Sequence, residues 1–413
     1  MTDVTSATAT LAAEPAPHLS PRNEAGVFYL LATIGALITA VGLGSALYME
    51  HEGHVVTGMN NHIVWGIPHV FAIFLIVAAS GVLNVASIGS VFGKTIYKSR
   101  APLSGLLSIA MLAGGLMVIM LDLGRADRII VAATHFNPTS VFGWNVILYP
   151  GMFAIVAVYL WTMMERRMNP WSKPAGFAAF TWRILLTTGT GSIFAFLIAR
   201  AAYGSALLAP FFIVLSFAWG LAVFIVVQAA LYYWNDMRLP PLVLKRMKNL
   251  LGVFIAATLY FTAVLHLTNA YFAKQIAFEA FLLFNSEFAS MFWIGQVLIG
   301  SLLPMALIWS PAGQRQRWVT VAALLVIVGA FFQLYVFIIG GQAYPLDIFP
   351  GYDISSSFMD GVADHYTPRL PEILLGLGGI GVAFTATTIG VRVLRFMPQD
   401  DISQLEAAGN ITD

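Results

Sequence analysis

Four polar residues in the first half of the sequence could together bind a ligand and exchange protons: His69, Asp122, Arg125 and Asn145. Histidine and aspartate take up and release protons near neutral pH when burial and pairing adjust their pKa values, and arginine and asparagine donate hydrogen bonds. A quinone head group needs these properties, because its two carbonyl oxygens require donors and its ring gains or loses protons on reduction or oxidation. The residue types therefore predict a quinone site with His69, Asp122 and Arg125 as catalytic candidates.

Aromatic and polar residues near these four could complete the walls of the site. The predicted quinone-binding set comprises His62, Trp65, His69, Asp122, Arg125, Trp144 and Asn145, with Phe71 as a further apolar wall. An alternative interpretation is purely structural. In it, Asp122 and Arg125 cap a helix and pair with each other, while His69 bonds a backbone carbonyl inside the bundle. The sequence leaves both interpretations open.

The elements that must position these residues are membrane-spanning helices. Of the 413 residues, 59% are hydrophobic and 10% charged, whereas about 25% are charged in an ordinary soluble domain. Apolar stretches of about 20 residues can cross a bilayer core, and such a segment must pair its own backbone groups as a helix. We predict an all-α integral membrane protein, a bundle of about ten transmembrane helices at 26–48, 65–92, 102–122, 141–164, 182–202, 207–234, 249–273, 288–309, 318–340 and 371–391.

The distribution of lysine and arginine predicts the orientation of this bundle. The two tails and the even-numbered loops carry fifteen of these residues and the opposite loops carry five, leaving out Arg183 near a helix start. Positive loops stay in the cytoplasm, so both termini are predicted to be cytoplasmic. The domain prediction is a flexible tail over 1–25 without a secretory signal, a membrane domain over 26–395 with a long periplasmic loop at 341–370, and a cytoplasmic tail over 396–413.

This topology predicts that the candidate site residues converge at the outer face. A rise of 1.5 Å per residue places His69 about one turn below the start of the second span, Asp122 at the end of the third, Arg125 just beyond it, and Asn145 at the start of the fourth. Consecutive helices joined by short loops are usually neighbours. We therefore expect one outer-leaflet pocket.

A second polar group lies in the later spans: His266, Asn269, Gln296, Gln333 and Tyr335. Interhelical hydrogen bonding is the preferred interpretation for this group. The glycine-rich stretch LLGLGGIG (374–381) lies inside an apolar span, so it predicts close helix packing and not a nucleotide loop.

The residue types that are missing narrow the function further. The chain has no cysteine, so it offers no thiolate for iron–sulfur clusters, zinc or covalent haem. Only His69 and His266 of the eight histidines lie inside spans, which disfavours a two-haem cytochrome. We predict no metal, no haem and no cluster held by this chain. A net charge of +1 gives no field for nucleic acid.

Several sequence runs carry a resemblance to a known family. They are NNHIVWGIPHVFAIFLIVAASGVLNVASIGSVFG (60–93), LDLGRADR (121–128), NPTSVFGWN (137–145) and VYLWTMMERR (158–167). The chain resembles the polysulfide-reductase membrane-subunit family, often called NrfD-like, and within it most closely the DsrP type of subunit. The resemblance covers nearly the whole chain after the N-terminal tail. Where smaller relatives often carry an acidic residue at the fourth-helix entry, this chain has Asn145.

The resemblance implies a function, a location and partners. Members of this family bind a quinone, ubiquinone or menaquinone, near the outer face of the bacterial cytoplasmic membrane and hold no prosthetic group. They exchange electrons with a periplasmic iron–sulfur protein, here one of the DsrO type. The complex to which DsrP belongs also contains a multihaem cytochrome c, a haem b membrane subunit and a cytoplasmic iron–sulfur subunit, and serves dissimilatory sulfur metabolism.

Two other functions remain as alternatives. A secondary transporter would place polar substrate groups near the middle of the membrane and show repeat symmetry, whereas this sequence has only isolated amides and hydroxyls at that depth. A passive anchor would only hold redox partners, with the acidic and aromatic segment between Tyr344 and Tyr366 as its docking surface.

Overall fold

A computed structural model describes residues 24–235, 237, 239–346, 352 and 361–398. The described part of the chain is built from helices and contains no strand, which confirms the predicted all-α class. Both predicted tails lie largely outside these residues, as does the middle of the predicted loop at 341–370. The helices are α1 (Glu24–Glu52), α2 (Ile67–Val82), α3 (Asn84–Ser90), α4 (Ala101–Leu121), α5 (Ile129–Thr134), α6 (Val141–Met164), α7 (Ser172–Ala195), α8 (Leu208–Trp234), α9 (Pro241–Tyr271), α10 (Ile276–Ala280), α11 (Phe288–Ser290), α12 (Leu303–Trp309), α13 (Gln316–Tyr335), α14 (Gly341–Ala343) and α15 (Leu370–Leu394).

Nine of the described helical segments are long and apolar enough to cross a membrane. The tenth predicted span, at 182–202, is the exception. Its helix is α7, which begins at Ser172 and ends at Ala195, so both predicted limits were wrong. α7 carries Lys173 and Arg183 among many hydroxyl groups, and apolarity alone therefore located it poorly. It is long enough to span a bilayer core, and its crossing stays a prediction.

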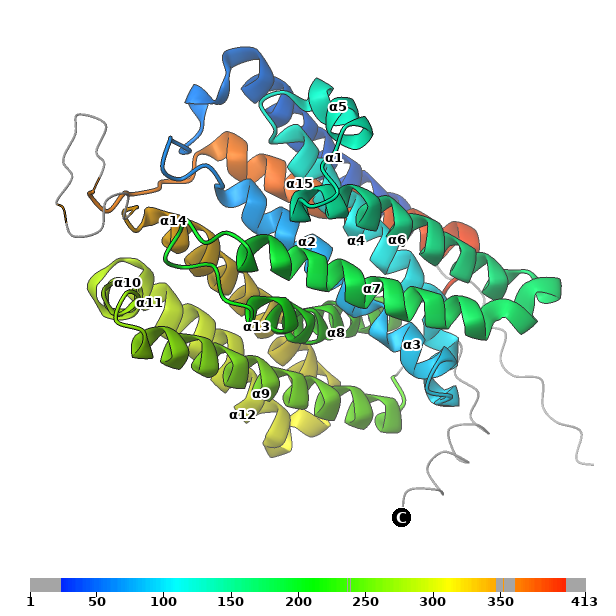
Figure 1. Cartoon of the computed structure of the whole chain (residues 1–413). Helices are drawn as coiled ribbons and strands as arrows, with labels where there is room; N and C mark the ends of the chain where they lie inside the picture. The colour runs from blue at the N-terminus through cyan, green and yellow to red at the C-terminus, as the bar shows by residue number, and fades with distance from the viewer. Residues whose placement is uncertain (1–23, 236, 238, 347–351, 353–360, 399–413) are drawn as a thin grey trace, which may run out of the picture.

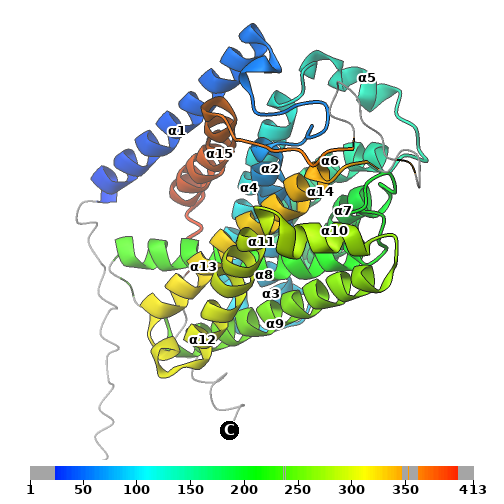
Figure 2. The same cartoon turned by 90° about the vertical axis from the view of Figure 1, so that its left-hand side faces the viewer.

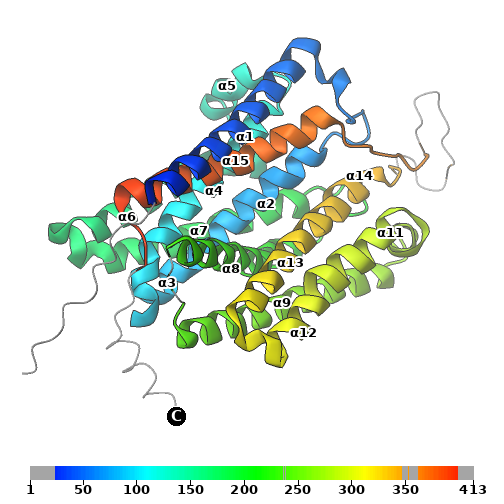
Figure 3. The same ribbon diagram turned by 180° about the vertical axis from the view of Figure 1, so that it is seen from behind.

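The helices form two groups that share a central seam. In the first group α2, α4, α6 and α7 contact one another, and in the second α8, α9, α12 and α13 do so. α2 packs on α8 and α13, and α7 packs on α8, so these contacts join the two groups. α1 and α15 run side by side along the first group, away from α9 and α12 (Figures 1 and 3). α2 and α15 begin, and α9 ends, at the same end of the bundle, which we call the entry end. α10, α11 and α14 also lie at this end (Figure 2).

Glycines bring the central helices into backbone contact. A Cβ atom on Gly81 of α2 would overlap the backbone of Ser216 on α8, and one on Gly220 of α8 would overlap the backbone around Gly81. In the stretch 374–381, Gly376 faces the ring of Phe71 and Gly378 faces Gly42 of α1. This agrees with the prediction of close packing, because small residues let membrane helices approach.

The second group departs from regular α-helix. Three segments of the described chain are π-helical: Phe281–Asn285, Met291–Leu302 and Val336–Gly340. The predicted span at 288–309 is thus made of α11, a π-helical middle and α12. Wide helical turns of this kind are rare and often occur at functional sites.

Candidate functional site

The start of α2 is fixed by contacts from distant parts of the chain. The backbone N–H of Ile67 donates to the Tyr366 hydroxyl over 2.8 Å, and that hydroxyl donates to Glu372 Oε1 over 2.7 Å. Glu372 is fully buried and also accepts the backbone N–H of Gly58. Burial raises the pKa of the Tyr366 phenol, which keeps its proton in this network. The loop before α15 therefore sets where α2 begins, and so where His69 lies.

His69 and Asp122 meet at the entry end. Nδ1 of His69 lies 2.9 Å from Oδ2 of Asp122, and the carboxylate is buried with its side chain 1% exposed. Asp122 directly follows α4, and its backbone oxygen lies 3.1 Å from Nε2 of His54. Neither Nδ1 of His69 nor Oδ2 of Asp122 has a hydrogen-bond partner among the described residues, so the pair is a close contact between imidazole and carboxylate. Nδ1 faces the carboxylate, and Nε2 is the ring nitrogen that faces away from it. Sequence reasoning had assigned His54 to a loop and missed its contact with Asp122.

Aromatic rings wall one side of His69. Trp65 stacks on the imidazole with ring centroids 5.9 Å apart and planes at 25°, and Phe194 of α7 meets Trp65 edge-on. Phe71 does not form the expected wall, because it packs against Phe331 of α13 and Gly376.

The segment that carries Trp65 is fastened to the second helix group. Gln342 of α14 accepts the backbone N–H groups of Val64 and Trp65 at its Oε1, and its Nε2 donates to the backbone oxygens of Trp65 and Ile338. Arg200 donates to the backbone oxygens of His62 and Gln342. His62 thus contributes its backbone to the frame of the entry segment.

Three of the predicted site residues lie elsewhere. The exposed Arg125 binds Asp127 through two hydrogen bonds of 3.0 Å, which lower the pKa of Asp127. The expected pairing of Arg125 with Asp122 was therefore wrong. Trp144 is 40% exposed and donates to the backbone oxygen of Pro138. Asn145 is buried, but its Nδ2 donates to Val141 of its own helix and its side chain lies beside Gly189 of α7. Of the predicted site residues, the structure brings His69 into contact with Asp122 and Trp65, whereas Arg125, Trp144 and Asn145 contact other partners.

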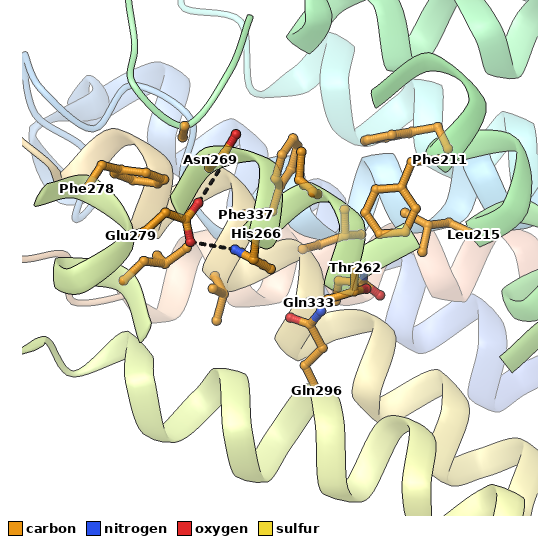
Figure 4. A pocket seen from close by; sticks show the side chains of 16 residues that line it. Phe211, Leu215, Thr262, His266, Asn269, Phe278, Glu279, Gln296, Gln333 and Phe337 are labelled. Atoms are coloured by element: carbon orange, nitrogen blue, oxygen red, sulfur yellow. Dashed lines mark hydrogen bonds and ion pairs between the residues drawn. The ribbon is translucent and has the colours of Figure 1, made fainter. Parts of the chain in front are cut away.

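A second histidine–carboxylate pair lies in the second helix group. Nδ1 of His266 on α9 is 2.8 Å from Oε2 of Glu279 on α10, and Nδ2 of Asn269 donates to Oε1 over 2.7 Å (Figure 4). The Glu279 side chain is 4% exposed. The expected hydrogen bonding of His266 and Asn269 across helices is confirmed, but their acceptor was missed. A carboxylate inside the apolar run 276–285 was the available signal.

A cavity of about 40 Å³ adjoins this second pair. Its polar lining comprises His266, Glu279, Asn269, Thr262, Gln296 and Gln333, and Phe211, Phe212, Phe278 and Phe337 supply aromatic walls (Figure 4). Tyr335 lies apart and contacts the rings of Phe288 and Tyr366. In the described part of the chain no group of three or more histidine or carboxylate side chains could hold a metal ion.

Comparison with known proteins agrees with this architecture. Residues 55–345 match the family described as polysulphide reductase, NrfD. The chain is 28% identical to the Hdr-like menaquinol oxidoreductase integral membrane subunit of Archaeoglobus fulgidus over 92% of its own length and 96% of the relative. It is 26% identical to a putative dimethyl sulfoxide reductase membrane subunit of Halobacterium salinarum, over 87% and 89%.

A third relative extends the range of complexes in which such chains occur. The chain is 22% identical to a selenate reductase subunit of Mesobacillus selenatarsenatis, over 90% of its own length and 95% of the relative. The three relatives are subunits of oxidoreductases. The family match covers both helix groups of this multi-pass chain. The chain belongs to the polysulphide reductase NrfD family.

Proposed function

We propose that this chain binds quinol at its entry end and exchanges electrons between the membrane quinone pool and a periplasmic iron–sulfur protein. The observation that carries the proposal is the His69–Asp122 pair at 2.9 Å, beside the face of Trp65. A quinone supplies the redox chemistry, and its ring carbonyls or hydroxyls need a partner that donates and accepts protons. The menaquinol named for the relative of A. fulgidus makes menaquinol the proposed substrate.

The residues present fit such a head group. Both carboxylate oxygens of Asp122 and Nδ1 of His69 are buried and have no hydrogen-bond partner among the described residues, so the pair retains unused bonding capacity. Asp122 would hold the imidazole and stabilise its protonated form, and Nε2 of His69 would accept a proton from the quinol hydroxyl. Trp65 would contact the ring face. The sequence has no cysteine to bind an iron–sulfur cluster, so the electrons must pass to a partner that has one.

The proposed assembly follows the DsrP resemblance. It comprises a DsrO-type iron–sulfur protein, a multihaem cytochrome c, a haem b membrane subunit and a cytoplasmic iron–sulfur subunit, in the cytoplasmic membrane of a bacterium that metabolises sulfur compounds. The presence of relatives in dimethyl sulfoxide and selenate reductases supports the general role, since these complexes also carry such a chain.

Electron transfer in the purified complex tests the proposal. A menaquinol analogue is added, and reduction of the iron–sulfur partner is followed optically in the wild type and in His69→Gln. We expect the rate to fall about 100-fold or more, the scale of a lost general base, while the complex remains assembled. An unchanged rate in an intact complex would show that the chain is a passive anchor at this end.

A further inference from the structure

The second helix group contains a buried acid–base pair that the proposed quinone site does not use. Oε1 of Glu279 accepts from Asn269 over 2.7 Å and Oε2 lies 2.8 Å from Nδ1 of His266, and this side chain of α10 is almost fully buried against α9. A carboxylate and an imidazole in contact can together hold a variable number of protons. Ionisable groups inside membrane bundles are expensive and usually functional.

The size of the adjoining cavity decides what can occupy it. A water molecule needs about 10–15 Å³ of such space, whereas a cavity that binds benzene measures about 150 Å³. The cavity beside His266 has about 40 Å³. It accommodates a few water molecules and excludes a quinone ring, and its amide and hydroxyl groups supply the partners that ordered water requires.

The polar space continues away from the pair. Gln296 and Gln333 line this cavity and also a second cavity of about 10 Å³, which has room for one water molecule at most and whose other polar side chains are Thr258 and Ser301. Along α9, Asn269, His266, Thr262 and Thr258 recur at intervals of three and four residues, which places them on one helix face. This face leads towards the end of the bundle opposite the entry end.

The other ionisable groups on the surrounding elements lie around this space. Lys248, on α9 at the opposite end, donates to the backbone oxygen of Ile308. Tyr203, between α7 and α8, donates to the backbone of the π-helical segment 336–340, and Arg200 lies near it. Glu287 and His365 pair with each other near the surface.

We propose that the His266–Glu279 pair is a buried proton-binding site, supplied through water in the two cavities lined by Thr262, Gln296, Gln333, Thr258 and Ser301. The pair takes one proton from water and returns it to water, and no electron is exchanged. The water space leads from the pair along the polar face of α9, towards the end of the bundle opposite the entry end. This role is independent of the quinone site, and the chain could show it without quinone or partners.

Infrared difference spectroscopy on the full chain in lipid nanodiscs, without quinone, tests the proposal. Spectra at low and high pH should contain the C=O band of a buried protonated carboxyl group. We expect Glu279→Gln to remove this band and His266→Gln to shift it. Glu287→Gln is the matched control, because Glu287 is 46% exposed, and it should retain the band. A wild-type spectrum identical to that of Glu279→Gln would overturn the proposal.

Hydrogen–deuterium exchange at the carboxyl group, followed as a shift of the same C=O band, tests the proposed water route. After transfer to heavy water the wild-type band should shift quickly, and Gln333→Leu together with Thr262→Val should slow the shift by at least about tenfold. Thr385→Val on α15 is the control, since the hydroxyl of Thr385 donates to Gly381 of its own helix and lines neither cavity. An unchanged rate in the double variant would overturn the water route. If the Glu279→Gln variant does not fold, the His266→Gln variant decides. A carboxyl C=O band at the wild-type position in that variant would overturn the proposed proton-binding site.

Discussion

Asp122 directly follows α4 and lies 2.9 Å from His69 of α2, although α3 and α4 separate the two residues in the sequence. Asp122→Asn keeps the shape of this contact but removes the negative charge that favours a protonated imidazole. We expect the rate of quinol-dependent electron transfer to fall about 100-fold, with a smaller change in quinone affinity, because the charge matters most when the proton moves.

Stopped-flow reduction of the partner and fluorescence quenching by quinone measure the two effects. His51→Gln is the control, because His51 is 86% exposed on α1 and belongs to neither pair. Equal losses of affinity and rate in Asp122→Asn would indicate that the carboxylate only shapes the pocket.

Tyr366 predicts a pH dependence of stability. Tyr366→Phe removes a bond from Ile67 and a bond to Glu372, so we expect a loss of about 1.5–3 kcal/mol in unfolding free energy at pH 8. Burial raises the pKa of the phenol above its ordinary value of about 10. The stability from this group is therefore complete below pH 10 and is lost as the pH rises towards the folded-state value.

Thermal unfolding between pH 7 and pH 11 checks whether the stability contributed by Tyr366 falls as the pH rises. The difference in Tm between the wild type and Tyr366→Phe should be constant at first and shrink above about pH 10. Tyr29→Phe serves as the control, because Tyr29 is exposed on α1. A difference that grows at high pH would contradict the prediction.

At Gly81, α2 and α8 lie too close together to admit a larger residue. Gly81→Ala would drive a Cβ into the backbone of α8, so we expect a loss of at least about 1–3 kcal/mol and a low yield of folded protein. Gly44→Ala adds the same methyl group to α1, where no atom lies within 4 Å, and should have little effect. Size-exclusion yield and Tm compare the two variants; similar behaviour would mean that the seam can spread.

Replacement of the buried Arg183 by an apolar residue should stabilise the protein. Its side chain is fully buried in α7, its guanidinium nitrogens have no hydrogen-bond partner among the described residues, and it rests on the rings of Phe180 and Phe217 at 4.7 and 5.2 Å. Cation–π contacts contribute up to about 2 kcal/mol, less than the cost of burying an unpaired charge. We expect Arg183→Met to raise Tm.

Arg317→Met is the matched comparison, because Arg317 makes the same kind of contact with Trp318 on an exposed side chain. It should leave Tm unchanged or slightly lower. A fall in Tm for Arg183→Met would mean that the guanidinium is satisfied by a bound molecule.

Apolar length located most of the spans from the sequence, because a segment of about 20 apolar residues can cross the bilayer only as a helix. The orientation inferred from the lysine–arginine asymmetry stays a prediction. The nearness of His69 and Asp122 was predicted from their depth and from the adjacency of consecutive helices. The partner of Arg125 was not, because the short turn after α4 gives it Asp127 as a nearer acceptor. Glu279 was missed for a related reason: it lies between two predicted spans, and only the folding of α10 against α9 buries it. The quinone role of His69 and Asp122 stays a prediction.

Gln342 links, through hydrogen bonds, the two segments that adjoin the two histidine–carboxylate pairs. Its amide ties the backbone before His69 to Ile338, and the same π-helical segment supplies Val336 and Phe337 to the cavity beside His266. If protonation at one pair changes ligand affinity at the other, thermodynamic reciprocity requires the reverse effect to be equally large. The Gln342 amide would then be one link, beside Arg200 and the packing of α2 on α8 and α13, through which the oxidation of a quinol and the uptake of a proton affect each other.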